Sequence, residues 1–399
     1  MRHTRSEECG ACLIKSERKF KLLTEVLSFL FILHLFCCST FANSDNKYLP
    51  EVKILKVSDL GAIETSSVIR GRDGGYSALY KGRSIWVFGD TIFKSNDQNG
   101  LNFHSSSWSV TSDLYAGDGI KKFIEINDSS GIPYELFPFT EEEKEYNESH
   151  SSDNCEIKPC GSRWAIWPGP VIEDQERNSL LVFYEKILVN SGHLNFKSQG
   201  HSLALWNDFA KPSTRINYNL SKKDRTILFD EKEPGFGSAA IVFDSMLYAF
   251  GCDSSGSSKP CRLARVVIKN AFSRKSWEYY SDQDKWQNKI GKCKVIFTGN
   301  NIMSVSYNLY LKKLIAIYSR PMSSDVMLRI AQKIEGPWSE PVLVFKAKRP
   351  ESDLGWVYDA LEHPEYAVDN GKTIYITYSR QTGLQNFEMR LVSVQLAKN

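Results

Sequence analysis

The chain has 399 residues, of which 42% are hydrophobic and 24% charged, a composition typical of globular proteins. Its formal net charge is only +3, and its lysines and arginines are interleaved with acidic residues. This excludes the strongly basic pattern of a nucleic-acid-binding protein, so we expect no nucleic-acid partner.

The first 42 residues have the pattern of a secretory signal peptide. Several basic residues precede an apolar run from Val26 to Cys38, and the small-residue segment from Ser39 to Ala42 suits cleavage. The run is shorter than the roughly 20 residues that a membrane-spanning helix needs. We expect residues 43–399 to form one secreted, periplasmic or cell-surface domain, with no integral membrane part beyond this segment. A membrane tether through an uncleaved signal anchor is the alternative.

Five cysteines follow the leader. In an oxidising compartment, Cys155–Cys160 and Cys252–Cys261 would each close a short loop, which leaves Cys293 as a buried thiol. No CxxC pair, histidine cluster or EF-hand loop accompanies them. We therefore predict structural disulfides, and neither a metal nor another cofactor.

A short strand pattern recurs five times in the remaining sequence. The copies are runs of β-branched and aromatic residues that begin at Ile85, Leu180, Leu247, Leu314 and Ile374. Each copy follows another apolar segment and a polar turn. These preceding segments are Tyr76–Tyr80, Gly169–Ile172, Ser238–Phe243, Met303–Tyr307 and His363–Val368. A further strand follows each copy, and a fourth follows three of them, at Thr226–Phe229, Lys294–Thr298 and Pro341–Phe345.

Four antiparallel strands in each of five units predict an all-β fold, a five-bladed β-propeller. The last unit lacks a fourth strand, and we expect Glu51–Val57 to supply it and close the ring. A polar insertion near residues 114–163 lengthens the first interval. We interpret the insertion as a solvated surface loop, with a lid or a subsite wall as the functional alternative.

Propeller geometry turns the repeat into a prediction of the site. The first strand of each blade lines the central channel and the second returns antiparallel beside it, so the start of one and the end of the other share a rim. Carboxylates, arginines and aromatic residues occupy these positions. The predicted catalytic residues are Asp73, Asp90 and Glu362, and the predicted substrate-binding residues are Trp164, Trp167, Glu185, Asn301, Arg320, Tyr358, Asp359, His363 and Arg380.

Paired carboxylates at such a rim suit glycosidic cleavage. One protonated acid donates to the leaving oxygen, and a second, ionised group activates water or attacks the anomeric carbon. Asp73 and Asp90 share one hairpin, so their proximity is the firmest inference. These residues could instead have purely structural roles. Asp73 could stabilise a turn, and Trp164 and Trp167 could pack in the core.

Two of these segments resemble a known family. Arg-Asp-Gly-Gly-Tyr-Ser at residues 72–77 and Trp-Val-Phe-Gly-Asp-Thr at residues 86–91 resemble the opening of a five-bladed propeller family, formerly of unknown function, that includes mycobacterial endo-D-arabinanases. Glu-Gly-Pro-Trp-Ser at 335–339 and Glu-His-Pro-Glu at 362–365 are more loosely similar to arabinanase- and levansucrase-type propellers. The resemblance implies a glycoside hydrolase of an extracellular or cell-wall polysaccharide, with Asp73 and Asp90 as the catalytic pair and Glu362 assigned by the looser likeness.

Two other classes remain open on the sequence alone. A non-catalytic carbohydrate-binding propeller would keep the aromatic residues and tolerate the loss of Asp73 or Asp90. A host-interaction module would carry a broad apolar patch at the rim in place of a carboxylate-lined pocket.

Overall fold

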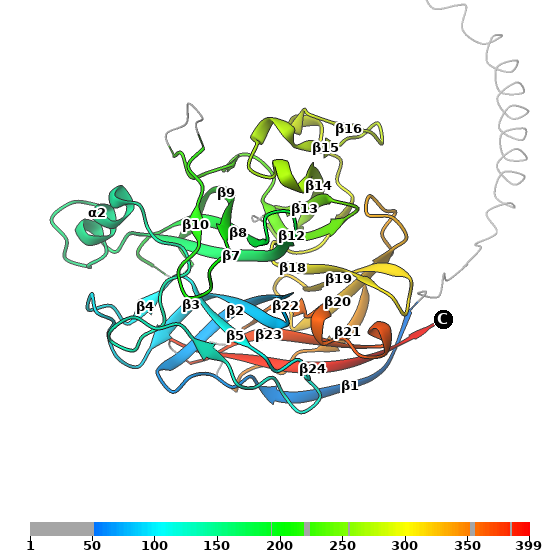
Figure 1. Cartoon of the computed structure of the whole chain (residues 1–399), viewed down its shortest axis with the longest axis horizontal. Coiled ribbons are helices and arrows are strands. Elements are labelled where there is room, and N and C mark those ends of the chain that lie inside the picture. The colour runs from blue at the N-terminus through cyan, green and yellow to red at the C-terminus, as the bar shows by residue number, and fades with distance from the viewer. Residues whose placement is uncertain (1–51, 193, 219–223, 254–255, 352–355, 384) are drawn as a thin grey trace, which may run out of the picture. The chain divides into compact units, whose positions relative to one another are not determined.

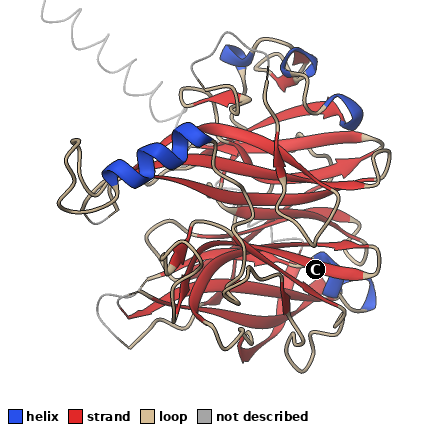
Figure 2. Cartoon of the chain, turned by 60° about the vertical axis from the view of Figure 1, so that its left-hand side comes forward, coloured by secondary structure: helices blue, strands red, loops and turns tan. Residues whose placement is uncertain are grey.

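A computed structural model describes residues 52–192, 194–218, 224–253, 256–351, 356–383 and 385–399. These residues form five antiparallel sheets (Figure 1), and strands dominate the described part of the chain (Figure 2). The innermost strands of the sheets contact one another in succession, and the first contacts the last. The predicted five-bladed β-propeller is therefore confirmed. The predicted signal peptide lies outside the described residues.

The blades follow one another along the chain. Blade 1 contains β2 (Ile69–Tyr80), β3 (Arg83–Phe93), β5 (Ser107–Thr111) and β6 (Ile124–Glu125), with β4 (Phe103–His104) paired to β3. Blade 2 contains β7 (Arg163–Asp174), β8 (Ser179–Val189), β9 (Phe196–Trp206) and β10 (Thr214–Arg215), with β11 (Phe229–Asp230) on β9. Blade 3 contains β12 (Phe236–Phe243), β13 (Met246–Cys252), β14 (Pro260–Val267), β15 (Glu278–Tyr280) and β16 (Trp286–Gln287), with β17 (Phe297–Thr298) on β14.

The last two blades complete the ring. Blade 4 contains β18 (Met303–Asn308), β19 (Lys313–Ser319), β20 (Asp325–Ala331) and β21 (Val342–Lys346). Blade 5 contains β22 (Val357–Glu362), β23 (Thr373–Gly383), β24 (Asn386–Lys398) and, as its outermost strand, β1 (Val52–Ala62). Short 3₁₀ turns occur at Ile268–Asn270, Arg274–Ser276, Ile290–Lys292, Pro364–Tyr366 and Asp369–Gly371.

The first strand of the chain closes the ring, as predicted. β1 pairs antiparallel with β24, and Val52 lies opposite Lys398. The pairing of β1 with β24 joins the two ends of the described chain within one sheet. All five sheets are built from residues that follow position 51. Closing a propeller in this way ties its first and last blades together through a full set of backbone hydrogen bonds.

The core lies between neighbouring sheets. In β3, the run from Ile85 to Phe88 is completely buried on both faces. This explains why the recurring pattern in the sequence is a continuous apolar run and does not alternate with polar residues. No helix of the described residues is long and apolar enough to span a membrane.

Blade 5 corrects the predicted strand positions. The expected first strand at His363–Val368 is wrong, because β22 ends at Glu362 and a 3₁₀ turn begins at Pro364. Proline lacks the backbone N–H that a central strand position requires, so the strand must end before it. The outer strand of blade 2 also differs, since Thr214–Arg215 pairs with β9 and only the end of the expected Thr226–Phe229 segment joins β11.

The polar insertion contains a helix, which corrects the expectation of a loop. Helix α2 (Glu141–His150) begins with a capping box, in which the Thr140 side chain accepts the Glu143 N–H and the Glu143 carboxylate accepts the Thr140 N–H. Glu143 is buried and also binds Arg215 at 2.6 Å and Lys186 at 2.5 Å. These ion pairs attach the helix to blade 2 in place of an apolar face.

Both predicted disulfides are present. Cys155 pairs with Cys160, and Cys252 pairs with Cys261 across adjacent strands of blade 3. Cys293 is half-buried and not fully buried as expected. Burial raises the pKa of its thiol to about 11, so the thiol stays protonated at neutral pH.

Candidate functional site at one end of the channel

A bulged hairpin positions Asp73. The register between β2 and β3 shifts around this residue, because Arg72 pairs with Thr91 while Gly74 pairs with Phe88. Gly74 has a φ of +76°, in the left-handed region that glycine adopts at little cost. A side chain on the facing Gly89 would place its Cβ 2.7 Å from the Asp73 carboxylate. The glycines in this part of the sequence therefore bend the strand and leave room for the carboxylate.

Blade 5 supplies two neighbours of Asp73. Tyr358 and Asp359 lie near the start of β22, where a second bulge separates the pairs made by Tyr358 and Leu361. The Tyr358 hydroxyl donates to the Asp73 carboxylate at 2.8 Å. Asp359 has a φ of +53°, a left-handed conformation that aspartate tolerates better than most residues. The first and last blades thus meet at one carboxylate cluster.

The electrostatics of this cluster favour protons on two of its members. Burial raises the pKa of Asp73 well above its ordinary value, and the negative charges of Asp90 and Asp359 raise it further. Burial raises the pKa of Asp359 to about 7. Asp73 and Asp90 nevertheless keep partial solvent exposure. Both carboxyl groups can therefore be reached from solvent.

Asp90 has a different environment. Burial raises its pKa, but the positive charge of Arg163 and a hydrogen bond from Trp167 both oppose that rise. The indole N–H of Trp167 donates to the Asp90 carboxylate at 2.8 Å. The pKa of Asp90 is therefore raised less strongly than that of Asp73, and this asymmetry favours the proton on Asp73 over Asp90.

Blade 2 provides the other side of the rim. Glu185 lies opposite Trp167 in the register of β7 and β8, and its carboxylate is 3.5 Å from the imidazole of His201. Burial raises the pKa of Tyr76 well above its ordinary value, and the charges of Asp359 and Glu185 raise it further. The charges of Asp359 in blade 5 and Glu185 in blade 2 both affect the pKa of Tyr76 in β2. Blades 2 and 5 therefore face the same part of the channel.

The structure does not bring Glu362 to this cluster. Glu362 is the last residue of β22, whereas Tyr358 and Asp359 lie near the beginning of that strand. Its carboxylate accepts from the Ser306 hydroxyl at 2.5 Å. Burial raises its pKa to about 7, with Glu365 the only other charged group that contributes to the rise. The contacts of Glu362 therefore place it in a separate buried cluster farther along the channel.

His363 belongs to that second cluster. Its side chain is fully buried, and its two ring nitrogens hydrogen-bond to Ser77 at 2.6 Å and Thr377 at 2.7 Å. Its ring also stacks on Trp86 with 4.3 Å between centroids. Burial lowers its pKa to about 3, so it is neutral. His363 was predicted to contact substrate, but its side chain has no solvent-exposed surface through which it could do so.

The other predicted binding residues lie around the rim at varying distance from the cluster. The backbone of Trp164 is bound by the side chain of Asn147 from helix α2, and the Lys186 ammonium lies 4.3 Å from the centre of its ring. Asn301 is half-buried, and its backbone N–H donates to Asn300. Two arginines pair within their own blades, namely Arg320 with Asp325 and Arg380 with Glu388.

Two residues near the cluster were missed by the sequence reasoning. Arg163 begins β7, directly before Trp164, and so occupies the rim position that the reasoning used for the other blades. That signal was present in the sequence. His201 lies on β9, the third strand of blade 2. The sequence prediction considered only the start of the first strand and the end of the second strand of each blade, so it did not include His201. Across the described residues, no group of three or more histidines, cysteines and acidic residues is arranged to hold a metal ion.

The fold and the site together define a five-bladed β-propeller with a carboxylate cluster at one end of its channel. The chain belongs to the family described as domain of unknown function DUF4185, whose profile matches residues 62–390. This agrees with the expected propeller family in its coarse form, and the match itself shows no link to endo-D-arabinanases. No curated protein matches the sequence.

Solved structures share the fold at low sequence identity. A protein of Bacteroides ovatus, provisionally described as a hydrolase, is 15% identical with a TM-score of 0.55, over 83% of this chain and 87% of that one. An α-L-arabinofuranosidase of Podospora anserina is 11% identical with a TM-score of 0.44, over 87% and 98%. A family 117 glycoside hydrolase of Zobellia galactanivorans is 8% identical with a TM-score of 0.45, over 86% and 89%. Some structural neighbours are thus glycoside hydrolases, and these likenesses show the fold alone.

Proposed function

We propose that this protein is a secreted glycoside hydrolase of an extracellular or cell-wall polysaccharide, similar in action to an endo-arabinanase. The observation that carries the proposal is the pair formed by Asp73 and Asp90, whose pKa values are raised unequally, so that Asp73 retains a proton in preference to Asp90. Such unequal pairs carry out acid–base cleavage of glycosidic bonds. The two disulfides support secretion, since disulfides persist in oxidising compartments.

Asp73 acts as the general acid in this proposal. Its carboxyl group donates a proton to the glycosidic oxygen as the bond to the anomeric carbon breaks, and the leaving sugar departs as an alcohol. The Tyr358 hydroxyl, 2.8 Å away, orients the carboxyl group and stabilises the carboxylate that forms. Burial raises the pKa of Asp73, and the nearby charge of Asp90 raises it further, so Asp73 stays protonated before the reaction begins.

Asp90 supplies the negative charge. Its carboxylate either removes a proton from the attacking water or attacks the anomeric carbon itself. Trp167 holds this carboxylate through its indole N–H, and the aromatic ring provides an apolar surface next to the reacting sugar. Glu185 lies opposite Trp167 on the adjacent strand and is placed to accept hydrogen bonds from sugar hydroxyls.

The test is release of reducing ends by the chain from residue 43 on arabinogalactan, linear arabinan, fructan and peptidoglycan-linked glycans. We expect Asp73→Asn and Asp90→Asn each to lower the rate by about a hundredfold or more. Asp253→Asn is the matched control, because Asp253 pairs with Arg262 on blade 3 outside the cluster. Binding without release, unchanged in both variants, would refute the hydrolase and indicate a carbohydrate-binding propeller.

A further inference from the structure

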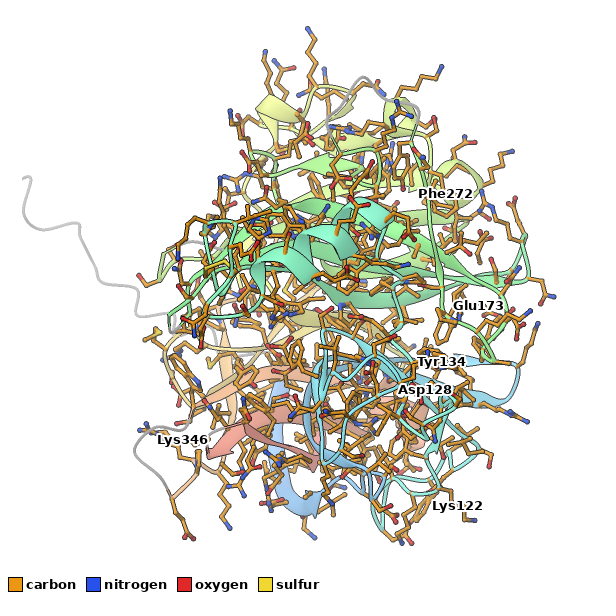
Figure 3. The ribbon with its side chains drawn as sticks, turned by 90° about the vertical axis from the view of Figure 1, so that its left-hand side faces the viewer. Lys122, Asp128, Tyr134, Glu173, Phe272 and Lys346 are labelled. Carbon is orange, nitrogen blue, oxygen red and sulfur yellow. A yellow bond between two sulfur atoms is a disulfide. The ribbon has the colours of Figure 1, made fainter. Side chains whose placement is uncertain are left out.

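The end of the propeller opposite the carboxylates carries exposed apolar side chains. They flank the turns between the first and second strands of blades 1, 4 and 5: Leu79 is 46% exposed, Tyr307 39%, Leu309 62% and Val368 39%. We call this end, with these four residues, the turn face. Glu173 and Phe272 at this end lie on the opposite side of the molecule from Lys346, which is at the carboxylate end (Figure 3).

The turns that carry these residues contact one another. The Tyr310 N–H donates to the carbonyl of Asn370, and the Asn308 side chain donates to the carbonyl of Gly371 at 2.8 Å. Blades 4 and 5 therefore present their turns as one surface. Blade 1 lies next to blade 5 in the ring, since β2 contacts β22. The apolar residues thus lie on three successive blades.

Positive charge gathers on the same three blades. The cations at this end are Lys81, Arg83, Lys312, Lys313, Lys372 and Lys398. Among the described turn residues of these blades, the acidic ones are Asp369 and Glu365, and Glu365 accepts hydrogen bonds from the Ser77 and Ser84 hydroxyls. The corresponding turns of blades 2 and 3 carry Glu173, Glu176 and Asp244, together with Arg177, which pairs with Asp174. On blades 1, 4 and 5, lysines or arginines therefore lie close in the chain to the exposed apolar side chains.

The N-terminal strand starts at this end as well. Val52 is paired with Lys398, so the described chain begins beside its own C-terminal strand on the turn face (Figure 1). The apolar run of the leader ends at Cys38, and the 13 residues 39–51 span at most roughly 45 Å. In a chain that retains the leader, Val52 therefore stays within about 45 Å of the membrane.

We propose that the turn face docks on a membrane surface that contains anionic lipids. Exposed apolar side chains surrounded by lysines are the chemistry of peripheral membrane contact, in which the apolar groups enter the interface and the cations pair with headgroups. A second copy of the chain fits less well, because two such faces would bring like charges together. Docking in this orientation points the carboxylate cluster away from the bilayer. The proposal does not depend on hydrolase activity.

Sedimentation with vesicles tests this docking. The chain from residue 43 is mixed with phosphatidylcholine vesicles, with or without phosphatidylglycerol, and the partition coefficient is measured at two salt concentrations. We expect binding only with phosphatidylglycerol, and weaker binding at high salt. Leu309→Ser should lower the partition coefficient about tenfold, and the double variant Lys81→Glu/Lys312→Glu at least about thirtyfold.

Two control variants change the same residue types at the carboxylate end. Met322→Ser and Lys346→Glu alter exposed side chains there and should leave the partition coefficient unchanged. Equal melting temperatures for all variants would show that folding is intact. The proposal is overturned by absent vesicle binding, by equal binding without phosphatidylglycerol, or by equal losses in test and control variants. A solution dimer that Leu309→Ser dissociates, without vesicle binding, would assign the face to self-association.

Discussion

Replacing Glu362 by glutamine should remove a pH-dependent part of the folding stability. The carboxyl group of Glu362 is buried, with the Ser306 hydroxyl as its hydrogen-bond partner. Glutamine has nearly the same shape and can accept that hydrogen bond through its amide oxygen, but it never ionises. The variant therefore isolates the cost of ionising residue 362 in the folded protein.

The expected magnitude follows from the pKa. Burial raises the pKa of Glu362 from 4.5 to about 7, a difference that corresponds to about 3 kcal/mol. The folded state binds this proton more tightly than the unfolded state. The associated stability is therefore fully present below pH 4.5, is lost as the pH rises toward 7, and changes little above that. Glu362→Gln should be free of this loss.

The assay is urea unfolding, followed by tryptophan fluorescence with the disulfides intact, between pH 4.5 and 8. The free energy of unfolding of Glu362→Gln, minus that of the wild type, should increase by about 3 kcal/mol across this range. Taking the difference cancels titrating groups that the two proteins share. Glu340→Gln, at an exposed position, should show no such increase. A difference for Glu362→Gln that stays constant with pH would refute the reasoning.

Three further predictions concern the site, the insertion and the unpaired thiol. Trp167→Phe keeps an aromatic ring but removes the N–H that binds Asp90, so kcat/KM should fall about tenfold or more and the acidic limb of the pH–rate profile should move to higher pH. Glu143→Gln leaves Arg215 without its buried counter-charge, so stability should fall by about 3 kcal/mol and proteolysis within the insertion should accelerate. Cys293, whose thiol pKa is about 11, should react with iodoacetamide at pH 8 much more slowly in the folded than in the unfolded protein; equal rates would contradict this.

Much of the architecture could be predicted from the repeat. The five apolar runs are second strands buried on both faces, and that burial is what makes them continuous and recognisable in the sequence. The ring closure by the N-terminal strand followed from counting strands, because the last unit was one strand short. Both disulfides followed from the short spacing of their cysteines.

The site was only partly predictable. Asp73 and Asp90 lie on one hairpin, so local pairing alone brings them together. Trp167 comes from blade 2, so its contact with Asp90 required blades 1 and 2 to pack together, whereas the effect of Asp359 from blade 5 on Asp73 required the ring to close. Glu362 was misplaced relative to the pair because the first strand of blade 5 was expected about six residues too late.

What the sequence by itself determined is the periodic part of this protein, namely the number of blades, their strands and the hairpin that holds two carboxylates. These features depend on contacts between residues close in the chain. The tertiary structure alone decided which residues share the carboxylate cluster, which of them favour a proton and which face carries the exposed apolar and positive groups. Those properties depend on burial and charge contributed by distant blades, and no local pattern in the sequence reports them.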